Sequence, residues 1–263
     1  MELSENDLKI YVVTHKKFDF KATPYYVPIQ VNAEKNEHFL NVTDDTGDNI
    51  SIKNDRFCEL TALYWIWKND HESKYVGLCH YRRYFDFNPT IHSGGKPEYK
   101  VSQIPYEEIQ FTPEVLSCLK NRDIIVPKKN VFRKRYSRRH LISYLTKLSV
   151  RDQYIKCHRE EDLRVLENVL LEEFPDYAEA WKKVMDGASL HICNMFVMKK
   201  SNFNDYAEWL FNILFKVEKQ IPPIDDSYQN RVFGFMAERL FNVYLVHNRI
   251  LIKEYPLFFI ENG

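Results

Sequence analysis

The predicted fold is built around the segment Tyr75-Val76-Gly77-Leu78-Cys79-His80-Tyr81-Arg82-Arg83-Tyr84-Phe85. Its first half is a short apolar run around a glycine, which is typical of a buried strand. Its second half places His80, Arg82 and Arg83 where that strand should end. Ligands of α/β domains bind at strand ends, and guanidinium groups make bidentate, permanently charged contacts with phosphate. These three residues are therefore candidates for an oxyanion site, and the alternative is that the arginines form ordinary surface ion pairs.

The composition is that of a soluble globular protein. The chain has 263 residues, 44% of them hydrophobic and 28% charged, which is enough for one large α/β domain. We expect a single domain over residues 1–263, with loops or insertions at 88–102 and 128–140. The chain has no run of about 18 apolar residues, so the sequence predicts no membrane span.

Charge and cysteine content exclude several classes of protein. The 37 basic residues balance the 37 acidic ones, whereas nucleic-acid-binding domains are usually basic, so we expect no nucleic-acid partner. Only seven glycines are present, and neither common phosphate-binding glycine motif occurs. The five cysteines form no C-x-x-C pair, which argues against structural zinc, and reduced thiols favour a cytoplasmic location.

Two polar segments near the N-terminus are candidates for nucleotide binding. A strand is predicted over 9–16, and its polar end carries Thr14 and His15, where α/β folds place a base or ribose. The alternative is a strand that simply reaches solvent. The second segment is a polar loop over 44–54, in which Gly47 permits a tight turn. It suits a ribose, a sugar hydroxyl or a metal, or it is a plain turn stabilised by its own Asp and Asn side chains.

The segment Phe57–Asn69 predicts one helix, with Asn54 or Asp55 as its cap. This helix is apolar on nearly every face, so we expect it to be buried. Glu59 within it then needs a partner, because a buried carboxylate without one is costly. Arg82 or Arg83 from the next strand is the expected partner.

The second half of the chain alternates helices and strands. A basic run interleaved with aromatic residues spans Lys128–Arg139 and ends at His140; it suits a solvated loop, an anionic-lipid surface, or a docking site for a phosphorylated acceptor. The sequence further predicts three helices, over Asp152–Glu173, Asp205–Glu218 and Tyr228–Asn242, the last of which Asp225 and Asp226 begin. A strand is predicted over His191–Lys199, with His191 and Asn194 at polar points. Closing strands are predicted over 243–246, 250–253 and 256–260.

Several long blocks, in order along nearly the whole chain, resemble one bacterial family. They are Lys9–Lys16, Asp45–Ser51, Phe57–Asn69, Gly77–Phe85 and His191–Phe196. The family is described as domain of unknown function 4422 and occurs in capsule, exopolysaccharide and O-antigen clusters. Its members resemble GT-A glycosyltransferases, and some are linked to galactose or galactofuranose transfer. The resemblance implies an α/β fold with a single GT-A-like (Rossmann-related) domain, whose central mixed, mostly parallel sheet is flanked by helices.

The resemblance also implies an activity. We expect transfer of a hexose, galactose or galactofuranose, from a nucleotide-diphosphate sugar such as UDP-galactose to a growing glycan or lipid-linked glycan. The acceptor would lie at the inner face of the cytoplasmic membrane, with possible peripheral contact between the basic run and anionic lipid. The alternative is a non-catalytic glycan- or lipid-binding subunit of a polysaccharide assembly complex. A metal-dependent nuclease or phosphatase using Asp44, Asp45 and Asp48 fits less well, because these carboxylates crowd one loop.

The absence of an Asp-x-Asp motif bears on the mechanism. Many GT-A enzymes hold a divalent metal with this motif, and it occurs nowhere in the chain. Cationic side chains can offset the charge of a departing diphosphate instead, so we predict no required cofactor and metal-independent transfer. The alternative is Mg²⁺ or Mn²⁺ with oxygen ligands from Asp86-Phe87-Asn88.

Candidate residues follow from these patterns. The predicted nucleotide-sugar-binding residues are Thr14, His15, Asp45, Gly47, Asp48, Asn49, Ser51, Lys53, His80, Arg82 and Arg83. An inverting reaction needs a base to deprotonate the acceptor hydroxyl. Asp226 is the favoured base, with Asp225 and Glu59 as alternatives, and the catalytic candidates are Asp226, Glu59 and His191. The residues expected to position acceptor or sugar are Trp65, Asn194 and Arg231.

Overall fold

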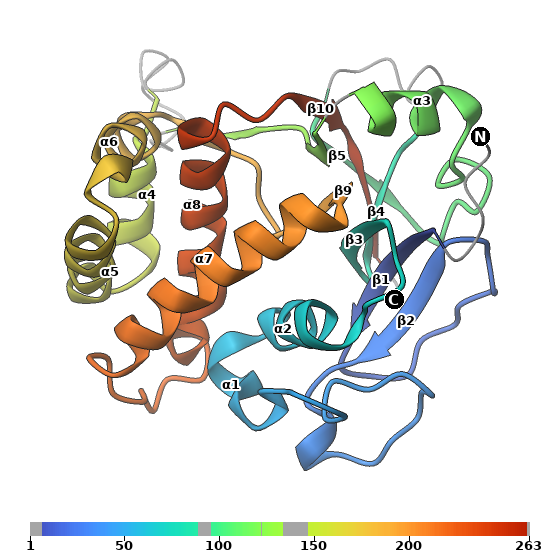
Figure 1. The fold of residues 1–263 in the computed structure, drawn as a ribbon, viewed down its shortest axis with the longest axis horizontal. Helices are drawn as coiled ribbons and strands as arrows, with labels where there is room; N and C mark the ends of the chain where they lie inside the picture. Colours follow the sequence, from blue (N-terminus) through green and yellow to red (C-terminus); the bar gives the residue numbers. More distant parts are fainter. Residues whose placement is uncertain (1–6, 89–95, 122, 134–146, 262–263) are drawn as a thin grey trace, which may run out of the picture.

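A mixed sheet flanked by helices forms the centre of the molecule (Figure 1). The computed structural model describes residues 7–88, 96–121, 123–133 and 147–261, and the statements below concern these residues. The strands are β1 Leu8–Thr14, β2 Tyr26–Gln30, β3 Tyr75–His80, β4 Arg83–Phe85, β5 Glu98–Val101, β6 Ile124–Pro127, β7 Asn130–Val131, β8 Ser189–Leu190, β9 Phe196–Lys199, β10 Ile252–Tyr255 and β11 Leu257–Ile260.

The sheet has the order β10-β6-β9-β3-β4-β11-β5, and β1 pairs with both β2 and β3. The pairs β1–β2, β1–β3, β6–β10 and β5–β11 are parallel, whereas β3–β4, β3–β9, β4–β11 and β6–β9 are antiparallel. The predicted α/β fold with a central mixed sheet is confirmed. The proline-punctuated segment that includes β2 is an edge strand, since β2 pairs only with β1 among the named strands.

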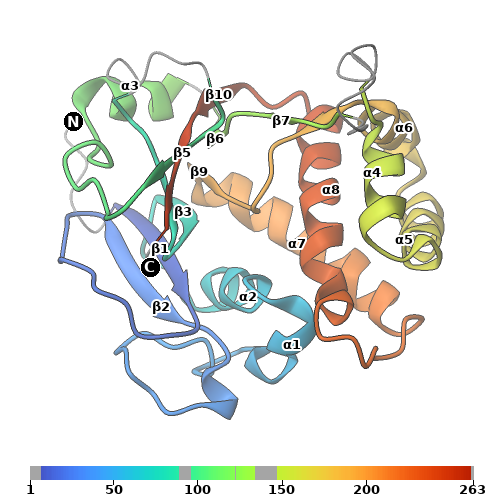
Figure 2. The same cartoon turned by 180° about the vertical axis from the view of Figure 1, so that it is seen from behind.

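Helices cover the sheet on both sides. They are α1 Asn54–Phe57, α2 Leu60–Asn69, α3 Pro113–Asn121, α4 Val150–Cys157, α5 Glu160–Glu173, α6 Ala178–Asp186, α7 Lys200–Glu218 and α8 Val232–His247. Both views show α8 between the sheet and a group formed by α4, α5 and α6 (Figure 1 and Figure 2). The α8 helix therefore has the sheet on one side and other helices on the other.

Alternation along the strands creates two cores. In β1, Tyr11 and Val13 pack into the larger core with α2, α7 and α8, while Ile10 and Val12 face a second core on the opposite side of the sheet. This is the period of two that a strand buried on both faces requires. Gly77 lies where strands approach closely: a Cβ there would meet the Phe196 carbonyl oxygen at 3.0 Å.

The predicted single helix over 57–69 is wrong, because Cys58 interrupts it. Cys58 has φ 51°, which ends α1, and α2 begins two residues later. The side-chain amide of Asn54 donates to the Cys58 carbonyl and to Thr61 Oγ1, so it stabilises this turn instead of capping a helix. No side chain caps α2, whose N-cap is Glu59.

Three other predicted elements differ. The helix over 152–173 is two helices, α4 and α5, because His158 is extended and ends α4. The predicted strand over 191–199 is shorter, because only its second half forms a strand, β9. Cys193 and Asn194 have φ of 74° and 50°, which no strand accommodates. Residues 243–246 belong to α8, because this apolar segment packs into the larger core.

Part of the predicted loop and basic run lies outside the described residues, namely 89–95 and 134–140. Within 88–102 the structure has β5, and within 128–140 it has β7. Among the helices that the structure describes, none has the length and apolar content needed to cross a membrane.

A buried carboxylate anchors the polar loop that precedes α1. Asp44 is fully buried and accepts hydrogen bonds from the backbone N–H groups of Asn32 and Ala33 and from the hydroxyls of Ser51 and Thr61. Through Thr61, this carboxylate also supports the turn at Cys58. Asp44 is therefore a structural residue, and the loop folds around it.

We expect Asp44→Asn to destabilise the protein by about 2 kcal/mol, because an amide nitrogen cannot accept and leaves buried donors unsatisfied. The measurement is urea unfolding followed by circular dichroism. The control is Asp55→Asn, since Asp55 pairs with Lys35 and its side chain is 58% exposed; an exposed pair contributes at most about 1 kcal/mol. Equal losses in the two variants would contradict the role assigned to Asp44.

Candidate functional site

The ends of β1 and β3 meet the start of α8. β1 and β3 run parallel, with Val13 opposite His80, so the residues that follow each strand lie side by side. The His15 and Tyr81 rings contact edge to face, with centroids 5.5 Å apart. The polar residues that the sequence predicted at the ends of these two strands thus lie side by side, and Arg231, just before α8, acts on both His15 and His80.

Asn194 joins this region to α8 and to the turn before α2. Its Nδ2 donates to Glu59 Oε1 at 2.7 Å and to the Gly234 carbonyl at 3.2 Å, and its side chain is buried. The hydrogen bond fixes the half-buried Glu59 carboxylate. The prediction that Arg82 or Arg83 is the partner of Glu59 is therefore wrong, because the neutral amide of Asn194 binds the carboxylate.

Three non-glycine residues with positive φ meet here: Cys58, Cys193 and Asn194, with φ of 51°, 74° and 50°. Each such residue costs roughly 1–3 kcal/mol and persists only when its surroundings hold it. The Cys193 N–H donates to Glu238 Oε1 at 2.7 Å, and the Cys193 carbonyl lies 2.7 Å from His80 Nε2. Strained backbone of this kind clusters at functional sites, which favours this place as the active site.

His80 is the neutral centre of the cluster. The Cys193 carbonyl can only accept, so His80 Nε2 carries the proton. Burial lowers the pKa of His80, the charge of Glu59 opposes this, and Arg83 and Arg231 lower it further. Burial likewise raises the pKa of Glu238, against the effect of its ion pair with Arg239.

The positive charge of Arg231 lies near the Glu59 carboxylate. Arg231 is exposed, and its Nε donates to Cys58 Sγ at 3.2 Å, next to Glu59. Burial lowers the pKa of His15, and the charges of Lys16 and Arg231 lower it further, so these groups lie near one another. Arg83 acts on both His80 and Cys193. The site therefore combines the Glu59 carboxylate, which Asn194 fixes, with the positive charges of Arg231 and Arg83.

The predicted arginine pair is divided. Arg82 donates to the carbonyls of Ile260 and Glu261 and lies over the Phe259 ring, so it is bound to the C-terminal strand. Arg83 pairs with Glu98 at 3.1 Å while its charge still reaches the cluster. The surface-pair alternative thus describes Arg83 in part, and Arg82 binds backbone.

The polar loop bonds to itself and to α2. The contacts of its predicted residues are Asp45 with His38, Asn49 with the carbonyls of Asp45 and Gly47, Asp48 with Tyr64 and Asn69, and Ser51 with Asp44. Gly47 has φ 58°, and a Cβ there would lie 2.0 Å from Asn69 Oδ1. Its nucleotide-binding role stays a prediction.

Other predicted residues lie in structural contacts. Trp65 donates to Thr46 at 2.8 Å, and Lys53 pairs with Glu218 at 2.6 Å. Thr14 is buried and donates to the Lys16 carbonyl. Asp226 is exposed, and its Oδ1 accepts from the N–H groups of Tyr228 and Gln229.

His191 is buried, away from solvent. Its Nδ1 lies 2.6 Å from the Pro127 carbonyl, its backbone pairs with the Asn242 side chain, and its Nε2 has no hydrogen-bond partner among the described residues. It precedes the Cys193–Asn194 turn and connects that turn to β6 and α8. From this position, His191 supports the Cys193–Asn194 turn through its contacts with Pro127 and Asn242.

Sequence reasoning missed Cys58, Cys193, Gly234 and Glu238 as members of the site. Glu238 had a signal, since a carboxylate within the apolar run of α8 needs a partner. The cysteines gave no such signal, because Cys193 acts through its backbone and the Sγ of Cys58 contacts Arg231, a residue far away in the chain.

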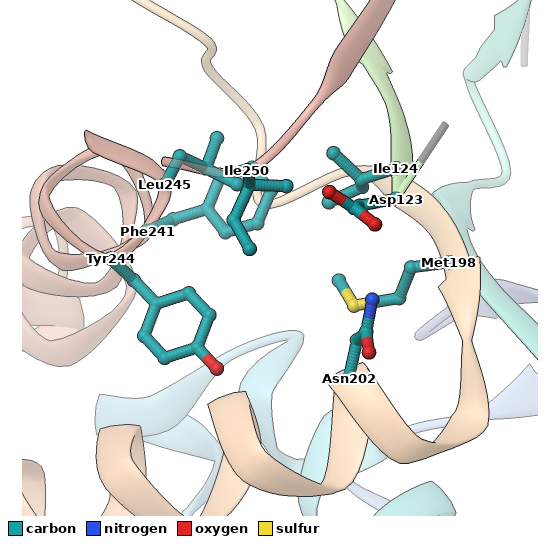
Figure 3. A pocket seen from close by; sticks show the side chains of 8 residues that line it. All are labelled: Asp123, Ile124, Met198, Asn202, Phe241, Tyr244, Leu245 and Ile250. Atoms are coloured by element: carbon teal, nitrogen blue, oxygen red, sulfur yellow. The ribbon is translucent and has the colours of Figure 1, made fainter. Parts of the chain in front are cut away.

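The small pocket in Figure 3 lies away from this cluster, between β6, β9 and the helices α7 and α8. Mostly apolar side chains line it, together with Asp123 and Asn202, and it has room for little more than a water molecule. A second, open depression lies at the β2 edge and includes Lys9 and Tyr25. Within the described ranges, no three His, Cys, Asp or Glu side chains gather in a metal-binding arrangement.

A sequence model of the family described as domain of unknown function (DUF4422) matches residues 9–249. The chain belongs to this family. Glu59, His80, Asn194 and Arg231 all fall inside the matched range.

Among solved structures, the apo structure of a bifunctional glycosyltransferase, WbbM, matches with a TM-score of 0.83 and 32% sequence identity. The match covers 98% of this chain and 46% of that chain, so the DUF4422 chain spans less than half of its structural relative. The predicted family and the GT-A-like fold class are confirmed. A search of curated proteins finds no match.

We expect the acid sensitivity of this protein to depend on His191. Burial lowers its pKa to about 4 from 6.5, so the unfolded chain binds a proton that the folded chain excludes, and stability falls as pH decreases from 6.5 to 4. His191→Asn should remove up to about 3 kcal/mol of this acid-induced loss. The measurement is urea unfolding at several pH values. Unfolding at pH 8 gives the cost of the substitution itself, and an unchanged pH slope would contradict the prediction.

Proposed function

We propose that this chain is a glycosyltransferase that moves a hexose from a nucleotide-diphosphate sugar to a polysaccharide under construction. The observation that carries the proposal is the strained cluster in which the Glu59 carboxylate, fixed by Asn194, lies beside Arg231 and near His80 at the end of β3. The similarity to a bifunctional glycosyltransferase over 98% of this chain supports it. Because the match covers 46% of a protein with two activities, direct assays must assign the reaction.

In this mechanism, Arg231 and Arg83 supply the positive charge that stabilises the departing nucleoside diphosphate, and the neutral His15 lies beside them. Charge develops on the leaving oxygen in the transition state, and positive groups fixed before the reaction stabilise it without reorganising. Their number supports transfer that needs no divalent metal. Arg231 has the most suitable position, because it is exposed while its Nε is held at Cys58 beside Glu59.

Glu59 is the proposed base of an inverting reaction. Its carboxylate is half-buried and held by Asn194, so it is oriented before an acceptor arrives. The neutral His80 lies close enough to be affected by the Glu59 charge. Asp226 is less suitable, because it is exposed and one of its oxygens binds two backbone N–H groups. A general base contributes typically 10²–10⁴-fold to a rate.

The family resemblance supports UDP as the nucleotide and galactose or galactofuranose as the sugar. It also supports a glycan or lipid-linked glycan acceptor of capsule, exopolysaccharide or O-antigen. Contact with an anionic membrane stays a prediction, since only Lys128–Arg133 of the basic run is described.

We expect Glu59→Gln to lower kcat by about 10²-fold or more while donor binding is retained, because Gln keeps the shape but cannot accept the proton. Release of nucleoside diphosphate measures kcat, and calorimetry measures donor affinity. Asp226→Asn is the matched carboxylate control and should change kcat less than threefold. A large loss in Asp226→Asn with little loss in Glu59→Gln would move the base to Asp226.

We expect UDP to raise the melting temperature in the presence of EDTA. A ligand at one hundred times its Kd stabilises by about 2.7 kcal/mol. The screen compares UDP, GDP, CMP and dTDP, each with EDTA and with Mg²⁺ or Mn²⁺. A shift that requires metal would keep the transferase and reject metal independence. No shift with any nucleotide would favour a non-catalytic glycan-binding subunit.

A further inference from the structure

A stack of aromatic rings lies beside the candidate site. The His158 ring stacks on Phe235, with centroids 3.9 Å apart and planes at 25°. Tyr228 lies 5.9 Å from His158 at 21°, and 5.2 Å from Phe235 at 45°. The three rings come from the end of α4, the α7–α8 connection and the first turn of α8, so tertiary folding alone brings them together.

Tyr228 is the exposed member of this stack. Its exposed fraction is 51%, and it is the only aromatic residue among the large exposed apolar side chains of the described part of the chain. Its backbone is held: the Tyr228 N–H donates to Asp226 Oδ1 at 2.8 Å, and its carbonyl accepts from the Arg231 N–H at 3.3 Å. The neighbouring Gln229 side chain donates to the Cys157 carbonyl at 3.0 Å. An aromatic surface is therefore presented to solvent in a fixed orientation.

Arg231 connects the stack to the candidate site. Its guanidinium carbon lies 6.0 Å from the Phe235 ring centroid, while its Nε contacts Cys58 Sγ at 3.2 Å. Cys58 precedes Glu59 directly in the chain. A ligand that covers the stack can therefore extend past Arg231 towards the Glu59 carboxylate.

The surroundings of the stack suit a sugar ring. A pyranose has an apolar face of C–H groups that packs on aromatic rings, and hydroxyls at its edge that need donors and acceptors. The exposed Asp225 and Asp226, which precede Tyr228 closely in the chain, and Arg231, whose guanidinium lies over the Phe235 ring, supply such groups. Burial lowers the pKa of His158 to about 4, so its ring is neutral at pH 7 and the surface stays apolar.

We propose that the Tyr228–His158–Phe235 stack is a subsite for one sugar ring of the acceptor glycan. The bound glycan is an acceptor only if the proposed transferase function is right, and the inference rests on that function in this respect. Glycan binding by the stack can be tested without any transfer. A nucleobase could also stack on these rings, and the experiment separates the two ligands.

The experiment uses the full chain with two probes, a galactose hexasaccharide and UDP, whose affinities are measured by calorimetry. Tyr228→Ala should weaken hexasaccharide binding about tenfold and leave UDP affinity unchanged. Tyr228→Phe should keep hexasaccharide affinity within about twofold, because it retains the ring. Leu251→Ala is the control, since Leu251 is 53% exposed but follows the opposite end of α8, about 24 Å away. Melting temperatures check that each variant is folded.

Each outcome decides the proposal. Loss of hexasaccharide affinity in Tyr228→Ala alone supports the subsite. Loss of UDP affinity in Tyr228→Ala makes the stack a base-binding surface and overturns it. Failure of the wild-type chain to bind the hexasaccharide at millimolar concentration, while UDP still binds, overturns the subsite and leaves the transferase intact. Tyr228-dependent hexasaccharide binding without any nucleotide binding supports the subsite as a glycan site and overturns the transferase.

Discussion

The side-chain amide of Asn194 is the contact on which the candidate site depends. It binds a carboxylate oxygen of Glu59 and the carbonyl of Gly234, and so joins the β8–β9 turn, the start of α2 and the first turn of α8. These segments are far apart in the chain. Without this amide, the Glu59 carboxylate would lose the hydrogen bond that orients it beside Arg231 and His80.

Backbone strain and electrostatics are balanced around that contact. The positive φ angles at Cys58, Cys193 and Asn194 are unfavourable locally, and the surrounding hydrogen bonds hold them. Glu238 and His80 bind the two sides of the Cys193 peptide segment, and burial keeps His80 neutral. The anchoring carboxylate Asp44 supports the Cys58 turn through Thr61. The site is therefore preorganised by residues that need not touch a substrate.

The sequence predicted well where local pattern decides structure. Apolar runs marked the buried strands β1 and β3 and the polar residues that follow each of them, and the parallel pairing of the two strands then brings those residues side by side. It failed where single residues adopt unusual backbone. Cys58 divides a predicted helix, and Cys193 with Asn194 ends a predicted strand, because each conformation depends on distant partners. Glu59 was correctly expected to need a partner, but its partner comes from more than a hundred residues away, which no local pattern reveals.

The order of long sequence blocks carried the family resemblance. Residue type and periodicity, which act within a few positions, were enough for the α/β class, the burial of the strands and the place of His80 at the end of a strand. Only the tertiary structure decided that Asn194 holds Glu59, that Arg82 binds the C-terminal strand while Arg231 reaches Cys58, and that Tyr228 lies on a stack with His158 and Phe235. These hydrogen bonds and ring contacts join segments that are far apart in the chain. They form only when α8 packs against the sheet, and that packing depends on the whole chain.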